Sequence, residues 1–259
     1  MCNTLMVLRR AAAGALGRAA SCRGFGAPPT GAGRLFLAHA QRPAPLAAAA
    51  RMMSVMASPP STRAADRTQV GRGDIMPLEE YLKVRKELAQ KFRAPEKKMR
   101  RVELGPSASI LFTSYDLIWF QIHEMLRIEK GGEEQIPDEL DAYKDLVPKG
   151  KELCGCLMYE IDNPVVRGKF LEKMVGSEND TSLSFGGETV VGKPIHDDID
   201  RTHPDGRTSA VHFLRWTLSD SQVEKFKSGG PVVLKMGHKD YKHMTELSPE
   251  LTASLAADL

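Results

Sequence analysis

The sequence predicts an α+β fold, a single domain in which an antiparallel or mixed sheet packs with helices. Some segments place apolar residues at helical spacing, and others are short apolar runs bounded by Gly or Pro. The two kinds of segment do not alternate strictly along the chain, which disfavours a doubly wound parallel sheet. The length after the N-terminal segment, about 194 residues, suits one domain with a sizeable core.

The first 65 residues differ from the rest of the chain in charge. They contain eight arginines, no lysine and no acidic residue, and the first acid is Asp66. Arginine without acid on an alanine-rich background is typical of a mitochondrial or chloroplast presequence. We therefore expect residues 1–65 to be a transit peptide and the start of a linker, with cleavage near Arg51–Ser54. Residues 66–259 then form the domain of a mitochondrial protein, with the chloroplast as the alternative location.

Loss of this segment reverses the net charge. The full chain has 36 basic and 33 acidic residues, so removing eight arginines leaves 28 basic against 33 acidic residues, a net charge of −5. Affinity for nucleic acid depends mainly on neutralising phosphates, so we expect no nucleic-acid binding. No apolar run of the domain reaches 18 residues, and we expect a soluble domain without a membrane span.

A first helix is predicted from Asp74 as its N-cap and Pro77 in its first turn, and Pro95 ends or kinks it. Its apolar residues at helical spacing are Leu78, Tyr81, Leu82, Leu88 and Phe92. Gly105-Pro106 then separates two extended runs, 102–104 and 109–113, as in a hairpin.

The helix predicted next, 115–130, is apolar almost all round, which indicates a buried helix. Further helices are predicted at 137–146, from Pro164 to about Met174, from Ser219 or Asp220 to Gly229, and from Ser248-Pro249 onward. Further strands are predicted at 152–161, as two pieces within 181–195 around Gly186-Gly187, at 208–218 and at 231–236. The strand 208–218 is apolar on both faces, which favours a central position in the sheet.

The domain carries no catalytic signature such as a Gly-rich phosphate loop, a Walker motif or G-x-S-x-G. Polar residues nevertheless interrupt the apolar helix 115–130: Gln121, Glu124 and Arg127 lie three apart on one stripe. Buried polar groups need partners, because an unpaired buried charge is costly. One interpretation is a structural Glu–Arg network that orients the helix. The other is a pocket in which Glu124 binds a metal or a proton and Arg127 binds an anion.

The strand 208–218 repeats this pattern, because alternation places His212 on one face and Arg215 on the other. Helix and strand are both apolar, so we expect them to share one core in which His212 approaches Glu124 and Arg127. In an enzyme, Glu124 would be an acid, base or metal ligand, Arg127 or Arg215 an anion anchor, and His212 a base or ligand. A satisfied core histidine is the alternative for His212.

Sulfur and acidic residues offer weaker metal candidates. Cys154, Cys156 and Met158 share one face of their predicted strand, where they suit Cu(I) or ordinary core packing. Cys2 and Cys22 leave with the predicted presequence, and the two remaining cysteines cannot supply a Cys₄ zinc site or an iron–sulfur cluster within this chain. The loop 196–205 holds His and Asp at irregular spacing, which suits a metal or a solvated acidic loop.

Three separated segments resemble one bacterial family. They are LIWFQIHEMLRIEK (117–130), DELDAYKDLVP (138–148) and TSAVHFLRWTLS (208–219), and they are similar in content and order to the family known as domain of unknown function 3501, over roughly 74–259. By position, the resemblance selects Gln121, Glu124, Arg127, Glu129, Asp138, Glu139, Asp141, Tyr143, His212 and Arg215. His123 stands where the family usually has Gln, and the CGC element at 154–156 has no family counterpart.

The resemblance implies no established activity. Bacterial members are often encoded beside a rubrerythrin and an iron–sulfur oxidoreductase of the heterodisulfide-reductase type, which implies peroxide or electron-transfer chemistry by association. We therefore expect an accessory or binding protein of a mitochondrial redox, iron–sulfur or peroxide-handling system, with a rubrerythrin-like or iron–sulfur oxidoreductase partner. The alternatives are a structural assembly factor and an enzyme. In that enzyme, the catalytic candidates are Glu124, Arg127 and His212, the cofactor-binding candidates are Gln121, Glu139 and Arg215, and the metal candidates are Glu124 and His212.

Overall fold

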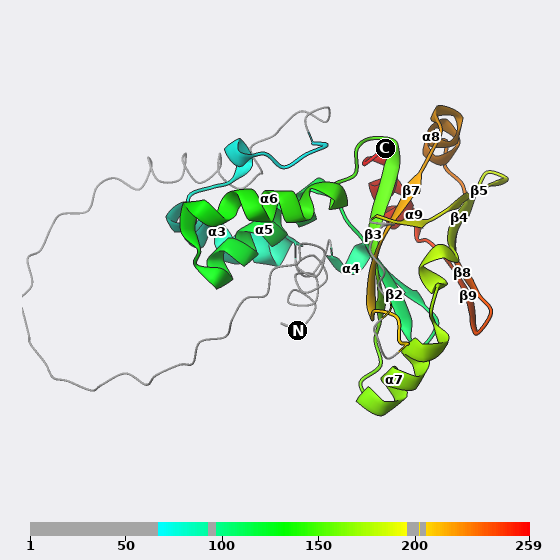
Figure 1. Ribbon diagram of the computed structural model, residues 1–259. Coiled ribbons are helices and arrows are strands. Elements are labelled where there is room, and N and C mark those ends of the chain that lie inside the picture. The colour runs from blue at the N-terminus through cyan, green and yellow to red at the C-terminus, as the bar shows by residue number, and fades with distance from the viewer. Residues whose placement is uncertain (1–66, 93–96, 196–201, 203–205) are drawn as a thin grey trace, which may run out of the picture.

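The structure, a computed structural model, describes residues 67–92, 97–195, 202 and 206–259 (Figure 1). The helices are α3 (Leu78–Lys91), α4 (Lys97–Met99), α5 (Tyr115–Glu129), α6 (Ile136–Tyr143), α7 (Pro164–Lys173), α8 (Asp220–Lys227) and α9 (Pro249–Ala256). The strands are β1 (Arg101–Leu104), β2 (Ala108–Phe112), β3 (Glu152–Tyr159), β4 (Thr181–Phe185), β5 (Glu188–Val191), β6 (Lys193–Pro194), β7 (Val211–Thr217), β8 (Val232–His238) and β9 (Tyr241–Glu246). The predicted presequence, Pro95 and most of the loop 196–205 lie outside the described residues.

One antiparallel sheet has the strand order β1-β2-β3-β7-β6. Its first two strands are the predicted hairpin. The strand predicted to be central from its two apolar faces is β7, and it is paired on both sides, with β3 and β6. In the β3–β7 register, Leu157 lies opposite His212 and Cys156 lies opposite Phe213. This register assigns the candidate histidine and the buried cysteines to opposite faces of the sheet.

A second antiparallel sheet has the order β5-β4-β8-β9. The hairpin β4–β5 is the predicted pair, and both glycines of its turn, Gly186 and Gly187, have positive φ. The strand β9 is absent from the sequence-based predictions. It is a polar edge strand in which only Tyr241 is buried, so it lacks the apolar run that identifies the other strands.

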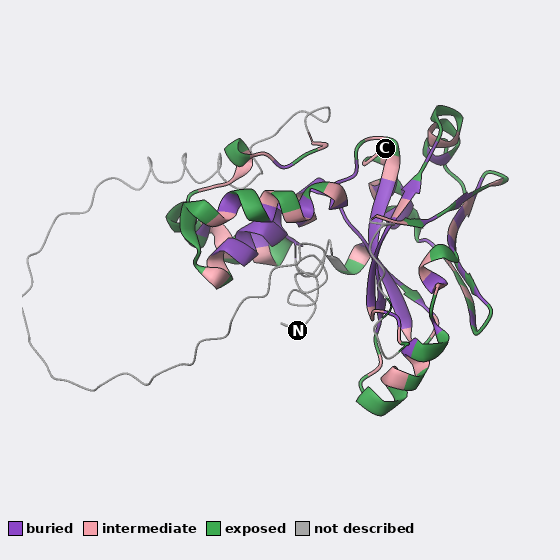
Figure 2. Cartoon of the chain, viewed as in Figure 1, coloured by how far each residue is buried: buried purple, intermediate pink, exposed green. Residues whose placement is uncertain are grey.

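The strands β1-β2-β3-β7-β6 form the middle of three layers, with α3, α5 and α6 on one face and the second sheet on the other (Figure 1). The core between the two sheets includes Leu157, Leu214, Trp216, Leu183 and Leu234. The core under the helices includes Cys156, Phe213, Trp119, Phe120 and Tyr81. Both cores use the same middle sheet, and β2, β3 and β7 are accordingly buried (Figure 2). The described residues therefore form the predicted α+β domain.

The helix α5 begins at Tyr115 after Ser114, whose hydroxyl accepts a hydrogen bond from the Leu117 N–H. It ends at Glu129, since Lys130 is left-handed with φ 56°. Every residue from Ile118 to Leu126 is buried, as the apolar character of the segment predicts. In the described part of the chain, no helix is long and apolar enough to cross a membrane.

The helix α3 differs from its prediction at its N-terminus. Asp74 does not cap it; the Asp74 carboxylate instead accepts a hydrogen bond from the Gly71 N–H around a short 3₁₀ turn. The helix starts after Pro77, whose restricted φ favours a helix start. Leu78 and Leu82 share the predicted helical spacing, but they are 41% and 51% exposed.

Candidate functional site

The predicted pairing of Glu124 with Arg127 is confirmed, and it is part of a larger network. The Glu124 side chain is 0% exposed and accepts a hydrogen bond from the Tyr81 hydroxyl at 2.8 Å. Arg85 donates to it through Nε at 2.7 Å and Nη2 at 2.9 Å. Arg127 donates through Nε at 3.2 Å and Nη2 at 3.4 Å. One buried carboxylate thus holds two guanidiniums, one from α3 and one from its own helix.

This environment keeps Glu124 charged. Burial by itself raises the pKa of a carboxyl group, but the hydrogen bonds from Arg85, Tyr81 and Arg127 outweigh it and lower the pKa of Glu124 to about 2. The Glu124 carboxylate raises the pKa of Arg85 in return. A carboxyl group with so low a pKa holds no proton to donate near neutral pH and is a weak base. The geometry therefore favours a role for Glu124 as an anchor of the two arginines.

The two guanidiniums reach the surface. The side chains of Arg85 and Arg127 are each 29% exposed, in contrast to the buried Glu124. Both arginines use Nε and Nη2 for Glu124, and within the described residues neither Nη1 donates a hydrogen bond. Among the described residues, Glu124, Arg85 and Arg127 together carry a formal charge of +1. Its outward edge is suited to an anion.

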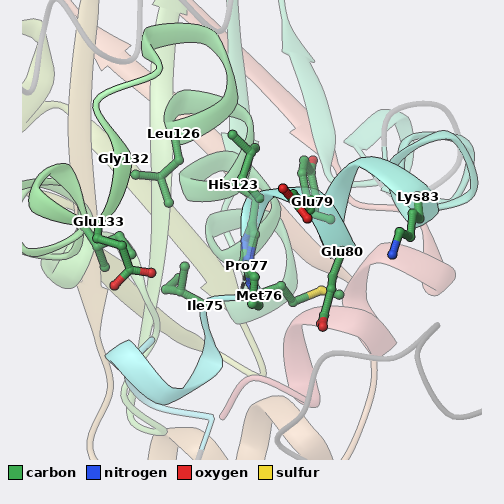
Figure 3. A pocket seen from close by; sticks show the side chains of 13 residues that line it. Ile75, Met76, Pro77, Glu79, Glu80, Lys83, His123, Leu126, Gly132 and Glu133 are labelled. Carbon is green, nitrogen blue, oxygen red and sulfur yellow. Dashed lines mark hydrogen bonds between the residues drawn. The ribbon is translucent and has the colours of Figure 1, made fainter.

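A pocket of about 360 Å³ lies beside this network, between the start of α3 and the helix α5 (Figure 3). Tyr81 connects the two features, because its ring lines the pocket while its hydroxyl donates to Glu124. The other lining residues are Ile75, Met76, Pro77, Leu78, Glu79, Glu80, Lys83, His123, Leu126, Gly132, Glu133 and Ile136. The wall is mostly apolar with charged groups at its rim, which is the usual character of a ligand pocket.

His123 closes the inner wall of the pocket and has a structural role. Its Nε2 accepts a hydrogen bond from the Met76 N–H at 3.0 Å, so its proton resides on Nδ1, which lies 2.8 Å from the Trp119 carbonyl oxygen. The Trp119 indole N–H donates to the Asp74 carbonyl oxygen at 2.7 Å. Burial lowers the pKa of His123 and keeps it neutral. These bonds fasten residues 74–76 to α5.

Gln121 and Glu139 lie on the opposite flank of α5, toward α6. The Gln121 amide donates to the Tyr143 hydroxyl at 3.4 Å, and Glu139 accepts from the Gln135 amide at 2.8 Å. Both side chains are buried, with 5% exposure. The Gln135 amide also donates to Glu129 of α5, so Gln121 directly and Glu139 through Gln135 join α6 to α5, whereas Glu124 joins α3 to α5. The predicted stripe of polar residues therefore serves two different helix contacts.

The prediction that His212 approaches Glu124 is wrong. His212 points from β7 toward the second sheet, where its Nε2 lies 2.8 Å from the Ser209 carbonyl oxygen and its ring packs edge-on to Tyr159. Its Nδ1 is 4.0 Å from the Glu178 carboxylate. Val211 and Phe213, its neighbours in β7, face the helices instead. Strand alternation thus puts His212 and Glu124 on opposite sides of the middle sheet, and they cannot share a metal or a proton.

Arg215 is also separate from Glu124, although it lies on the helix-facing side of β7. Its Nη2 donates to the Asp145 carbonyl oxygen at 3.0 Å, and its Nε lies 3.3 Å from the Glu152 carboxylate. Arg215 therefore joins the end of the α6 region to the start of β3. The anion anchor predicted from Arg127 or Arg215 is supported by the surroundings of Arg127 alone.

The cysteines behave as core residues. Cys154 and Cys156 are buried on one face of β3, as predicted, and neither forms a disulfide in the described part of the chain. Burial raises the pKa of Cys154 to about 12, so its thiol stays protonated. Within residues 67–92, 97–195 and 206–259, no three His, Cys, Asp or Glu side chains are grouped so that they could hold a metal ion.

Two residues of the network, Tyr81 and Arg85, are absent from the sequence-based candidates. A signal for Arg85 exists in the spacing of α3, where Tyr81, Leu88 and Phe92 are buried. Arg85 lies four residues after Tyr81 and three before Leu88, on the same buried stripe. A charged residue at such a position needs a buried partner of opposite charge, and Glu124 in α5 is that partner.

The comparisons with known proteins agree with the expected resemblance. The model of the family described as "Protein of unknown function (DUF3501)" matches residues 69–259. A crystal structure of a novel protein of unknown function from Burkholderia pseudomallei K96243 is 38% identical with a TM-score of 0.67, and the match covers 74% of this chain and 99% of that chain. No curated protein matches significantly. With most of its length matched, the chain belongs to the DUF3501 family of proteins of unknown function.

Proposed function

We propose that this protein is an accessory binding protein of a mitochondrial redox, iron–sulfur or peroxide-handling system, and that the layer of α3 and α5 is its binding part. The observation that carries the proposal is that the helices α3 and α5 bear a pocket, two partly exposed arginines and exposed apolar side chains. Leu78 and Leu82 of α3 and Ile128 of α5 are 41%, 51% and 38% exposed. Apolar side chains grouped near cationic ones are typical of a protein-binding surface.

The alternative of an enzyme built on Glu124, Arg127 and His212 lacks support from the geometry. Such an enzyme needs its acid, base and anchor within reach of one bound substrate. His212 faces the other core, and Glu124 is engaged by two arginines that keep its pKa low. A structural assembly factor remains the second candidate, and it is favoured by the buried polar contacts that join α5 to α3 and to α6.

The partner and the compartment are further parts of the proposal. Bacterial members of the family are often encoded beside a rubrerythrin and an iron–sulfur oxidoreductase, and this association supports a partner of either kind. The acid-free, arginine-rich segment 1–65 supports import into mitochondria.

The experiment is a calorimetric titration of the full-length protein with a purified rubrerythrin and with a purified iron–sulfur oxidoreductase of the heterodisulfide-reductase type. Leu78→Asp places a charge on the lining of the pocket, and we expect it to weaken binding about tenfold or more. Val165→Asp is the control, since Val165 is 67% exposed on α7, away from the helical layer. Equal loss in both variants, or no binding of either partner, contradicts the proposal.

A further inference from the structure

We infer that Arg85 and Arg127 together bind one carboxylate of an acidic segment of a partner protein. The inference rests on the proposed function, because it names the chemistry by which the helical layer recognises that partner. It starts from the observation that one fully buried carboxylate, Glu124, holds two arginines at once.

The charge of the cluster calls for a second anion. Glu124 neutralises one of the two guanidiniums, and the other leaves an excess positive charge. Both guanidiniums bond the same carboxylate oxygens, so they are close to each other and repel. A carboxylate on the solvent side would balance this charge without being buried deeply. Its desolvation cost is therefore smaller than that of a fully buried ion.

The geometry is prepared for such a ligand. Glu124 fixes the Nε and Nη2 edges of Arg85 and Arg127, which leaves their Nη1 groups as donors on side chains that are 29% exposed. The Tyr81 hydroxyl fixes the carboxylate in turn. An arginine already held in place loses less conformational freedom on binding than a mobile one does. The two guanidiniums therefore present a preorganised pair of donors.

The surroundings favour a protein segment over a free anion. Leu82 lies one helical turn before Arg85 on α3, and Ile128 lies one helical turn after Glu124 on α5. Both are large apolar residues with 51% and 38% exposure. A free phosphate gains nothing from apolar neighbours, whereas an acidic peptide with apolar side chains contacts both kinds of group. The occupant that fits the edge formed by the two arginines and these apolar residues is an acidic, partly apolar segment of a protein, which would lie away from the Glu79 and Glu80 side of the pocket.

The test uses the full-length protein and three probes: a short acetylated peptide of glutamate and leucine, its glutamine counterpart, and inorganic phosphate. We expect the acidic peptide alone to shift the NMR signals of the Arg85 and Arg127 Nε–H groups, with an affinity that falls as salt rises. Arg127→Gln should weaken this binding at least about tenfold. Arg101→Gln is the matched control, because Arg101 is 31% exposed, pairs with Glu160 and lies in β1.

A second variant distinguishes loss of the binding site from an effect of Arg127→Gln on folding. Leu82→Glu leaves the Glu124 network intact and supplies a carboxylate of the chain itself, three residues before Arg85. We expect it to compete with the acidic peptide and to weaken binding as Arg127→Gln does. Unchanged peptide affinity in Leu82→Glu and Arg127→Gln overturns the inference, and so does binding of phosphate without the peptide.

The inference and the proposed function can fail separately. If the rubrerythrin or the oxidoreductase binds and Arg127→Gln does not affect it, the proposed function stands and the carboxylate site is wrong. If the acidic peptide binds at Arg85 and Arg127 but neither partner does, the site stands and the proposed function is wrong.

Discussion

Replacing Glu124 by alanine tests the energetic role of the network directly. The substitution leaves the guanidiniums of Arg85 and Arg127 facing each other without their shared counter-ion, and it removes the acceptor of the buried Tyr81 hydroxyl. Glu124→Gln keeps the shape and one acceptor oxygen but removes the charge. We expect both variants to be destabilised, and the alanine variant more strongly, because it also leaves a cavity.

The magnitude follows from the protonation equilibrium. The pKa of Glu124 falls from an ordinary 4.5 to about 2 in the folded protein. At about 1.36 kcal/mol per pH unit, the charged form contributes roughly 3 kcal/mol to the free energy of unfolding at neutral pH. Removing one member of a buried ion pair costs about 3–5 kcal/mol, which agrees. For a domain of this size, the melting temperature should fall by roughly 6–12 °C.

The pH dependence gives a second readout with a definite sign. Because the folded-state pKa of Glu124 is lowered, its contribution is complete above the unfolded pKa of about 4.5 and is lost as the pH falls toward about 2. As the pH falls between those values, the free energy of unfolding of the wild-type protein should decrease by roughly 3 kcal/mol more than that of Glu124→Gln. The stability of Glu124→Gln should depend less on pH in this window.

The assay is chemical denaturation followed by circular dichroism, at pH 7 and across the acidic window. Asp141→Ala is the control, because Asp141 and Lys144 form an exposed ion pair at the C-terminal end of α6, and its loss should cost less than about 1 kcal/mol. Equal losses in the free energy of unfolding for Glu124→Ala and Asp141→Ala would show that the Glu124 network does not stabilise the fold. A wild-type protein whose acid sensitivity matches that of Glu124→Gln also contradicts a stabilising role of the network.

Three further predictions concern other parts of the chain. Cys154→Ser and Cys156→Ser should each cost about 1 kcal/mol through packing and leave partner binding intact; loss of a bound metal in either variant contradicts this. Gly192→Ala should cost about 1–3 kcal/mol in a thermal melt, because its Cβ would lie 2.7 Å from Trp216 Nε1, and wild-type stability would show that the contact relaxes freely. N-terminal sequencing of the organelle protein should find cleavage between about residues 23 and 66, and a mature protein that begins at Met1 opposes the presequence.

The local pattern of apolar and capping residues was sufficient to predict many of the helices and strands. The apolar run of 115–130 predicts the buried α5, and the helices capped by Asn163, Ser219 and Ser248 begin where they were predicted to begin. The Glu124–Arg127 pair is also local, because residues three apart lie on the same helix face. The strand β9 was missed because a polar edge strand is stabilised by pairing with β8, which no local pattern reports.

For the candidate site too, local pattern predicts some of the contacts, and packing between distant segments supplies the others. The burial of Glu124 and its need for a cation could be predicted from the sequence, since helical spacing and the cost of a buried charge are local arguments. Only the tertiary structure decided that Arg85 and Tyr81, 39 and 43 residues away in sequence, supply the remaining bonds. It also decided that His212 faces the second sheet. Strand alternation tells which residues share a face, but the layer that covers that face is chosen by packing between distant segments.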